Sequence, residues 1–206
     1  MRYGKIICSG WNYHSHNAEM KKEDLPTEPI IFLKPSSCLI GDGDEIVIPE
    51  GVTNVSYEVE LALIFGKTGK NIKREDALSY VSHIAVFNDV TARDMQTKAR
   101  TDGNPWSLAK GMDTFGAMSK PVKASGFDLS DLKLKMTFNG EVRQDSNTSQ
   151  MIFSPAVLIE YVSKYMTIEK GDILSTGTPE GVGEMRSGDV LCASIEGVGK
   201  ICNRVR

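Results

Sequence analysis

The sequence predicts a single mixed domain that is mainly β-structure with a few short helices. Two observations favour this class: short strand-like segments are scattered from one end of the chain to the other, and helical patterns between them are few. The 206 residues include 24 Lys and Arg, 27 Asp and Glu and 40% hydrophobic residues, a composition typical of folded globular proteins. The chain contains no repeats or long linkers, so we expect residues 1–206 to form one domain.

The expected strands are short runs of alternating or β-branched apolar residues between turn signals. The clearest is a hairpin, in which residues 132–138 alternate apolar and polar positions and Asn139-Gly140 supplies a type I′ turn before residues 141–144. A second hairpin is predicted at the C-terminus around a turn at residues 196–199. The remaining strands are expected at residues 5–8, 30–33, 45–48, 57–65, 83–87 and 172–175, and the terminal pair at residues 190–195 and 200–205.

Helical patterns occur at four places. The strongest is residues 156–165, where the apolar residues have helical spacing, Ser154 supplies an N-cap and Pro155 suits the first helical position. Shorter helices are predicted at residues 12–22, 74–81 and 91–101.

The composition argues against several functions. The net charge is −3 and no dense basic block is present, so we expect no nucleic-acid partner. No apolar run is long enough to span a bilayer and residues 1–8 lack a signal-peptide pattern, so we expect no membrane partner and a cytoplasmic location. The four cysteines form no C-x-x-C pair, and we interpret them as reduced thiols. A simple register of the terminal hairpin does not place Cys192 directly opposite Cys202.

A divalent metal site is one interpretation of the acidic residues in the middle of the chain. Glu58 and Glu60 share one face of the strand predicted at residues 57–65. Two ionised carboxylates in a buried strand repel each other and are costly to desolvate, and Mg²⁺ or Mn²⁺ would offset both effects. Asp89, at the end of the next strand, offers a third oxygen ligand. The alternatives left open are an edge strand with two solvated glutamates and an N-cap role for Asp89.

Three further features have both a chemical and an ordinary interpretation. His16 and Glu19 are three residues apart on a predicted helix, and a carboxylate beside an imidazole suits a water-activating base, although surface pairs of this kind are common. Lys110 lies among small and apolar residues and is either a desolvated lysine that stabilises an enolate or a snorkelling one. The Gly-rich loop at residues 175–183 either binds a carboxylate through its N–H groups and Thr hydroxyls or is a plain turn.

In this order, these segments resemble the fumarylacetoacetate hydrolase family, in particular its short single-domain acylpyruvase and oxaloacetate-acting members. The resemblance is carried by E-V-E-L at residues 58–61, N-D-V-T-A-R-D at residues 88–94 and T-G-T-P-E-G-V-G at residues 176–183. Further matches lie at residues 12–19, 32–35, 106–110 and 151–154, so the resemblance spans almost the whole chain. Two positions depart from the family pattern: Trp11, beside the helix of residues 12–22, and Met112, which we expect to be a packing change.

The resemblance implies a fold, a cofactor and a set of site residues. The implied fold is the β-roll or sandwich of the family's C-terminal domain, in a homodimer that binds Mg²⁺ or Mn²⁺. Residues 12–25 are expected to be a mobile lid. The implied metal ligands are Glu58, Glu60 and Asp89, the catalytic residues are His16, Glu19 and Lys110, and the substrate-binding residues are Thr178, Gly177 and Gln96.

The implied activity is that of a metal-dependent hydrolase that cleaves a C–C bond in small anionic 2-oxo acids of the 2,4-dioxo type, such as acylpyruvates and fumarylacetoacetate. The sequence leaves open an oxaloacetate decarboxylase or tautomerase and a 2-hydroxyhepta-2,4-diene-1,7-dioate isomerase with the same site. A non-catalytic metabolite-binding protein is a more distant alternative.

Overall fold

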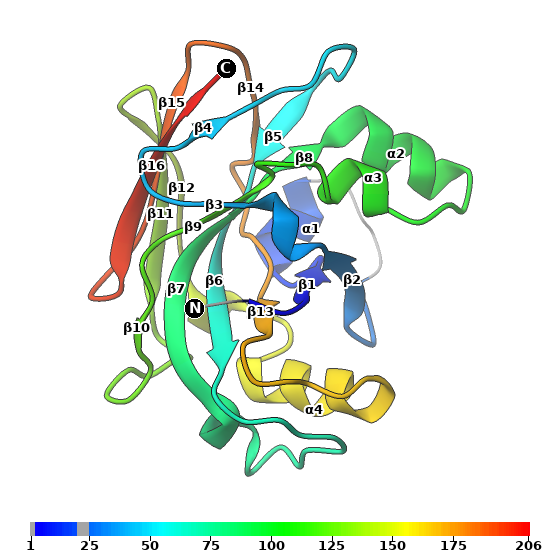
Figure 1. The fold of residues 1–206 in the computed structure, drawn as a ribbon, viewed down its shortest axis with the longest axis vertical. Helices are drawn as coiled ribbons and strands as arrows, with labels where there is room; N and C mark the ends of the chain where they lie inside the picture. The colour runs from blue at the N-terminus through cyan, green and yellow to red at the C-terminus, as the bar shows by residue number, and fades with distance from the viewer. Residues whose placement is uncertain (1–2, 20–24) are drawn as a thin grey trace.

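The structure is a computed structural model that describes residues 3–19 and 25–206 (Figure 1). Its described part contains a large curved sheet, a five-stranded sheet and a small three-stranded sheet. The large sheet runs from edge to edge through β2 (Ile30–Lys34), β1 (Ile6–Gly10), β13 (Ile173–Ser175), β6 (Val59–Phe65), β7 (Val81–Asp89), β9 (Gly116–Met118) and β3 (Leu39–Ile40), and β10 (Val122–Lys123) also pairs with β7.

The other two sheets flank the large one. The five-stranded sheet has the order β12 (Glu141–Asn147), β11 (Lys133–Phe138), β15 (Val190–Ile195), β16 (Gly199–Val205) and β4 (Glu45–Ile46). The three-stranded sheet has the order β14 (Gly183–Met185), β5 (Val55–Tyr57) and β8 (Thr91–Ala92). The helices are α1 (His14–Glu19), α2 (Arg93–Thr101), α3 (Ser107–Lys110) and α4 (Pro155–Tyr165), with 3₁₀ turns η1 (Ser36–Cys38), η2 (Ala77–Tyr80) and η3 (Thr148–Gln150). The predicted class, mainly β with a few short helices, is therefore confirmed.

The main core lies between the large sheet and the five-stranded sheet, which stands at the left of Figure 1. Leu61 and Leu63 of β6 pack there with Leu134 of β11 and Ala193 of β15. The opposite face of β6 belongs to a second apolar cluster, which contains Ala62 and Ile64. The strand is therefore buried on both faces.

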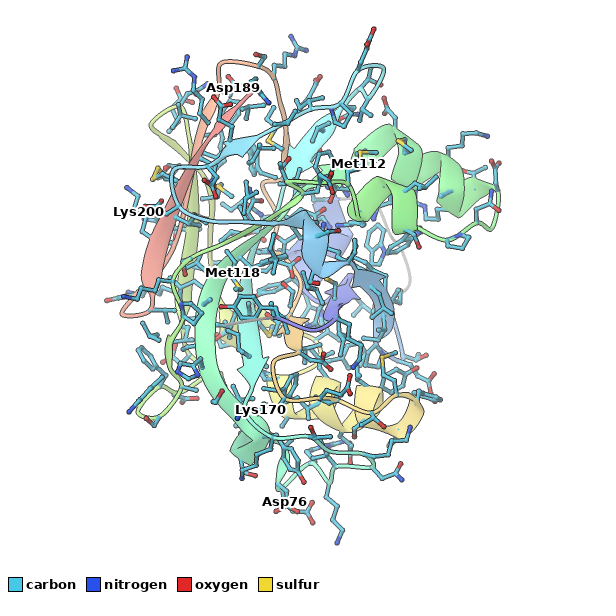
Figure 2. The ribbon with its side chains drawn as sticks, in the orientation of Figure 1. Asp76, Met112, Met118, Lys170, Asp189 and Lys200 are labelled. Carbon is cyan, nitrogen blue, oxygen red and sulfur yellow. A yellow bond between two sulfur atoms is a disulfide. The ribbon has the colours of Figure 1, made fainter. Side chains whose placement is uncertain are left out.

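Some of the charged side chains lie at the periphery of these layers. Asp76 and Lys200 lie at the bottom and left edges of the molecule in Figure 2, whereas Met118 lies on the large sheet. Met112 packs against the main core, which agrees with the expected packing change at this position.

Local signals in the sequence account for the well-predicted elements. Asn139 and Gly140 have φ angles of 51° and 86°, so the turn between β11 and β12 has the left-handed conformation that a type I′ turn requires. The helix α4 begins as expected, because the Ser154 side chain accepts a hydrogen bond from Val157 N–H and Pro155 occupies the first position.

Three predicted boundaries are wrong because pairing with distant strands overrides the local pattern. Residues 74–76 form turns and only η2 is helical, because β7 begins at Val81. Residues 91–92 pair with β5, so α2 begins at Arg93. The strand expected at residues 57–65 is interrupted at Glu58, whose N–H donates to the Asn88 side chain at 2.9 Å.

The interpretation of all four cysteines as reduced thiols is also wrong. Cys192 and Cys202 are directly opposite in the β15–β16 ladder and form a disulfide, with Cα atoms 4.1 Å apart. The prediction took residues 196–199 as the turn, but Gly199 already pairs with Ile195, and this shorter turn changes the register. Cys8 and Cys38 are free and buried.

Two other predictions concern the whole chain. Within residues 3–19 and 25–206, none of the helices combines the length and apolar character needed to cross a bilayer. Of the predicted lid at residues 12–25, the structure describes α1 and the residues beside it, and residues 20–24 lie outside the described part.

Candidate metal centre and catalytic site

Three carboxylates converge where the adjacent strands β6 and β7 of the large sheet meet at one end. Glu60 lies on β6, Asp89 ends β7, and Glu58 lies in the interruption between β5 and β6. One carboxylate oxygen from each lies within 4.8 Å of the others, and all three residues are buried. The edge-strand alternative is wrong, because β6 pairs with β13 on one side and β7 on the other. The N-cap alternative for Asp89 is also wrong, because α2 is capped at Ala92.

Three cationic side chains contact this cluster. Lys110 Nζ lies 2.8 Å from Glu58 Oε2 and 2.7 Å from Asp89 Oδ2, and Lys110 is 2% exposed. A snorkelling role for Lys110 is therefore wrong. Lys34, at the end of β2, donates to Asp89 Oδ1, and Arg93, at the start of α2, donates to Glu58 Oε1.

The three cations do not stabilise the carboxylates equally, because the pKa of Glu60 is raised while that of Glu58 is lowered. Burial, together with the nearby charges of Asp89 and Glu58, raises the pKa of Glu60 to about 8. Burial also acts to raise the pKa of Glu58, but Lys110 and Arg93 outweigh it and hold that pKa well below its usual range. In the same way, the two carboxylates that contact Lys110 outweigh its burial and raise its pKa, so the amine stays charged.

The residues present fit a hard divalent cation. The cluster offers three oxygen ligands of the kind that Mg²⁺ and Mn²⁺ prefer. The raised pKa of Glu60 means that a third carboxylate ionises here only at a cost, which a bound cation would remove. Ser175 Oγ and Gly177 N–H both donate to Glu60 Oε2, at 2.5 and 2.8 Å, and so hold this carboxylate in place.

His16 and Glu19 lie together on α1, as predicted. His16 Nδ1 lies 3.5 Å from Glu19 Oε2, and His16 is 5% exposed, so the pair is more than a solvated surface contact. Burial lowers the pKa of His16, although Glu58 acts in the opposite direction. The Glu19 carboxylate also accepts from Gly181 N–H at 3.0 Å, which connects α1 to the Gly-rich loop.

The residues before α1 determine where this pair stands. The Asn12 amide donates to Phe153 O at 3.0 Å and to Thr176 O at 2.8 Å, and its oxygen accepts from Phe153 N–H. Trp11 has a φ of 61°, an unusual conformation for a bulky residue, and its ring lies 5.6 Å from the His16 ring. The start of the predicted lid is thus anchored to two other segments.

The three predicted substrate-binding residues have different surroundings. Thr178 is buried, and its Oγ1 lies 2.9 Å from Gln144 Nε2. The Gly177 N–H already donates to Glu60, so the structure shows Gly177 supporting a proposed metal ligand. Gln96 Oε1 accepts from Arg93 at 2.8 Å, and Arg93 in turn donates to Glu58. Gln96 therefore reaches the carboxylates only through Arg93. Direct contact of these residues with a substrate stays a prediction.

Sequence reasoning missed three residues of the site. Lys34 is a lone charge at the end of an apolar strand, a signal that was available. Arg93 lies within the motif at residues 88–94 but was assigned no role of its own, and it pairs with Glu58. Gln144 gave no signal, because most of its neighbours in β12 are also polar.

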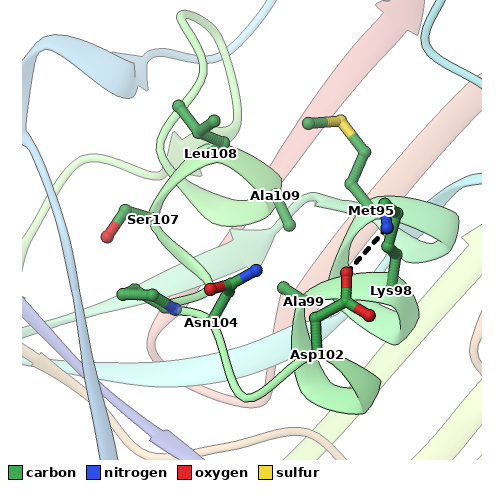
Figure 3. Close-up of a pocket in the computed structure, with 9 residues that line it drawn as sticks. Met95, Lys98, Ala99, Asp102, Asn104, Ser107, Leu108 and Ala109 are labelled. Carbon is green, nitrogen blue, oxygen red and sulfur yellow. Dashed lines mark hydrogen bonds and ion pairs between the residues drawn. The ribbon is translucent and has the colours of Figure 1, made fainter.

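One cavity lies away from this site. It has a volume of about 440 Å³, lies between α2 and α3 and contains none of the three carboxylates (Figure 3). Its lining residues are Met95, Lys98, Ala99, Asp102, Asn104, Pro105, Ser107, Leu108 and Ala109.

Comparison with known proteins identifies the family. A family model described as the C-terminal domain of fumarylacetoacetate hydrolase matches residues 5–206. The chain belongs to the fumarylacetoacetate hydrolase family. Its resemblance to this family, inferred from the ordered motifs, is therefore confirmed.

Named members of the fumarylacetoacetate hydrolase family differ in activity. Oxaloacetate tautomerase FAHD1 of Arabidopsis thaliana is 41% identical over 96% of this chain and 88% of its own. Fumarylpyruvate hydrolase of Pseudomonas aeruginosa, solved with Mn²⁺ and pyruvate, has a TM-score of 0.95 and 32% identity over 98% of this chain and 89% of its own. The 2-hydroxyhepta-2,4-diene-1,7-dioate isomerase of Mycobacterium marinum has a TM-score of 0.87 and 35% identity over 98% of this chain and 74% of its own.

Proposed function

We propose that the protein is a divalent-metal-dependent hydrolase that cleaves a C–C bond in small anionic 2,4-dioxo acids. The observation that carries the proposal is the convergence of Glu58, Glu60 and Asp89 beside a buried, charged Lys110. Membership of the fumarylacetoacetate hydrolase family and similarity to a fumarylpyruvate hydrolase support it.

The three carboxylates are the groups that would hold the metal. Bound there, Mg²⁺ would act as a Lewis acid toward the substrate's oxo group. We propose Mg²⁺, with Mn²⁺ as the alternative that the Pseudomonas aeruginosa structure contains.

His16 is the proposed general base. Because burial lowers its pKa, the imidazole is neutral near pH 7 and can accept a proton from water. Glu19 beside Nδ1 favours the tautomer in which Nδ1 carries the proton and Nε2 is the basic atom. The hydroxide formed from this water adds to the distal carbonyl carbon, and the C–C bond to the neighbouring carbon then breaks.

Lys110 is the proposed stabiliser of the leaving enolate. Its raised pKa keeps the ammonium group charged in a buried site, where charge interacts strongly with a developing oxyanion. The enolate then takes up a proton and leaves as a 2-oxo acid, so that acetylpyruvate would give acetate and pyruvate.

Oxaloacetate chemistry is the second candidate, favoured by the 41% identity to oxaloacetate tautomerase FAHD1. Tautomerisation and decarboxylation both pass through an enolate that Lys110 would stabilise, and neither consumes an attacking water. The isomerase alternative shares this enolate and has a neighbour of known structure.

A side-by-side assay of acetylpyruvate and oxaloacetate with Mg²⁺ tests these candidates. The hydrolase proposal predicts release of acetate from acetylpyruvate, lost in Glu58→Ala and reduced about a hundredfold or more in His16→Ala. Lys200→Ala, on an exposed hairpin, serves as the control and should keep full activity. Turnover of oxaloacetate alone would move the assignment to the second candidate, and no turnover of either acid with Mg²⁺ or Mn²⁺ would refute both.

We also propose that the protein forms a homodimer and is cytoplasmic. The family resemblance supports the dimer. The cysteines no longer support the cytoplasmic location, since two of the four are bonded.

A further inference from the structure

The buried side chain of Gln144, on the five-stranded sheet, connects β6 of the large sheet to the Gly-rich loop. Gln144 lies on β12 and is 1% exposed, whereas its neighbours Arg143 and Asp145 are exposed. Its Oε1 accepts a hydrogen bond from Val59 N–H on β6 at 3.0 Å, between the two proposed glutamate ligands. Its Nε2 lies 2.9 Å from Thr178 Oγ1 in the Gly-rich loop.

Backbone groups determine the orientation of this amide. Val59 N–H can only donate, so the atom that faces it is the amide oxygen. The carbonyl oxygens of Pro179 and Glu180 can only accept, and they lie 3.0 and 3.3 Å from the other atom, which is therefore nitrogen. A flipped amide would bring two N–H groups together and place an oxygen against two carbonyls. The atom next to Thr178 is thus a nitrogen, which donates and does not accept.

This orientation restricts the hydroxyl of Thr178. The hydroxyl cannot donate its proton to Gln144, so its proton is directed elsewhere. Among residues 3–19 and 25–206, no recorded hydrogen bond has this hydroxyl as the donor, although Thr178 is 4% exposed. Thr178 follows Gly177, whose N–H donates to Glu60, so the donor stands next to the proposed metal centre. A buried hydroxyl of this kind is suited to a carboxylate that enters the site.

We propose that Gln144 is a positioning residue that keeps the Thr178 hydroxyl available as a hydrogen-bond donor to the carboxylate of the oxo-acid substrate. The inference rests on the proposed function, which supplies the ligand class. Gln144 acts through Thr178 and the loop at residues 176–183, and it does not itself contact the substrate.

Gln144→Glu tests this role with little change in shape. One oxygen of the introduced carboxyl still accepts from Val59 N–H, while the other faces the Thr178 hydroxyl and the carbonyl oxygens of Pro179 and Glu180. Of these three groups only the Thr178 hydroxyl can donate, so its proton turns toward the carboxylate. We expect pyruvate to bind the Mg²⁺-loaded variant about tenfold more weakly than it binds the wild type, measured by calorimetry. For a substrate that the wild type turns over, KM should rise by a similar factor while kcat changes less.

Thr178→Val supplies the partner variant. It removes the hydroxyl and should weaken pyruvate binding to a similar extent, and the double variant should bind no more weakly than Thr178→Val alone. Lowering the pH should protonate the introduced carboxyl of Gln144→Glu and restore pyruvate affinity, whereas Thr178→Val should show no recovery.

A merely structural role for Gln144 predicts a different pattern, with a lower melting temperature, a lower kcat and additive losses in the double variant. Unchanged pyruvate affinity in Gln144→Glu, or additive losses, would overturn the inference. If Gln144→Glu does not fold, Gln144→Met replaces it in the same comparison with Thr178→Val.

Failure of the proposed function gives a separate result: a wild type that binds pyruvate but turns over neither oxo acid refutes that function alone. A wild type that binds no pyruvate overturns the inference about Gln144.

Discussion

Glu60 is a proposed metal ligand whose charge is costly in the metal-free protein. Burial, Asp89 and Glu58 raise its pKa from 4.5 to about 8. Because the folded-state pKa is above the unfolded value, this group binds more protons in the folded state between these two pH values. Its contribution to stability is therefore present at low pH and is lost as the pH rises toward about 8.

Glu60→Gln should separate stability from metal binding. In chelator at about pH 9, we expect its free energy of unfolding to exceed that of the wild type by about 2 kcal/mol, with a smaller gain at about pH 6. Mg²⁺ should raise the melting temperature of the wild type and leave that of Glu60→Gln unchanged. Urea unfolding and thermal melts measure both effects, with Glu184→Gln as an exposed control. A variant that is less stable than the wild type at both pH values would contradict the proposed charge conflict.

His16 should determine the acid side of the pH profile. Burial lowers its pKa below 6.5, and the opposing effects of Glu58 and Glu19 do not restore it. A base must be deprotonated to act, so log kcat/KM should begin to fall only below pH 6.5. Steady-state rates across the acid range measure this limb. Glu19→Gln removes a carboxylate that raises the pKa, so the limb should move to still lower pH. A limb above pH 6.5 in the wild type would exclude His16 as the titrating base.

At this scale, the sequence predicts best those site residues whose placement depends on local geometry. The alternation expected over residues 57–65 predicts that Glu58 and Glu60 share a face, and their carboxylates do converge although β6 begins only at Val59. The helical repeat likewise brings His16 and Glu19 together. The role of Gln144 depends on its contact with Val59 of β6, a residue 85 positions away in the chain. No local sequence pattern predicts a contact between residues so far apart.

The hairpin of β15 and β16 is the element whose chemistry the sequence misjudged. Its disulfide joins Cys192 and Cys202, which are 10 residues apart. Closing a loop of this size restricts the unfolded chain, so Cys192→Ser with Cys202→Ser should lower the free energy of unfolding by about 2–3 kcal/mol. Urea unfolding under non-reducing conditions measures the difference.

Thiol counting provides an independent check on the same element. The denatured, unreduced protein should show two reactive thiols, those of Cys8 and Cys38, and reduction should raise the count by two. Four thiols without a reductant would mean that the paired sulfurs lie side by side unbonded, as expected in a reducing cytosol.

For the other elements, the sequence predicts positions along the chain but not the pairing of distant strands. The hairpin at Asn139-Gly140 and the capped helix α4 are encoded by adjacent residues and appear where expected. The order of the large sheet places β1 beside β13 and the break at Glu58 beside β7, and these contacts join segments far apart in the chain. They depend on the packing of the whole core, which a pattern of a few residues does not determine.

At the scale of the whole molecule, one side of the protein has an apolar character that suits the proposed dimer. β2 is the outer strand of the large sheet, and the grooves beside it continue to α3 on one side and α4 on the other. Leu33, Leu108 and Tyr165, on these three elements, are 44%, 74% and 68% exposed. Exposed sheet edges and contiguous apolar surface are usually covered in a stable protein.

The prediction is that a second copy of the chain covers this side. Light scattering after gel filtration should give twice the 22.6 kDa mass of one chain. Leu108→Asp places a charge beside the α2–α3 cavity and should shift the protein toward monomer, because an unpaired charge is costly to bury in an interface (Figure 3). Val142→Asp, at an exposed position on the five-stranded sheet, is the matched control and should stay dimeric. A monomeric wild type would refute the dimer, and a dimeric Leu108→Asp would place the interface on another face.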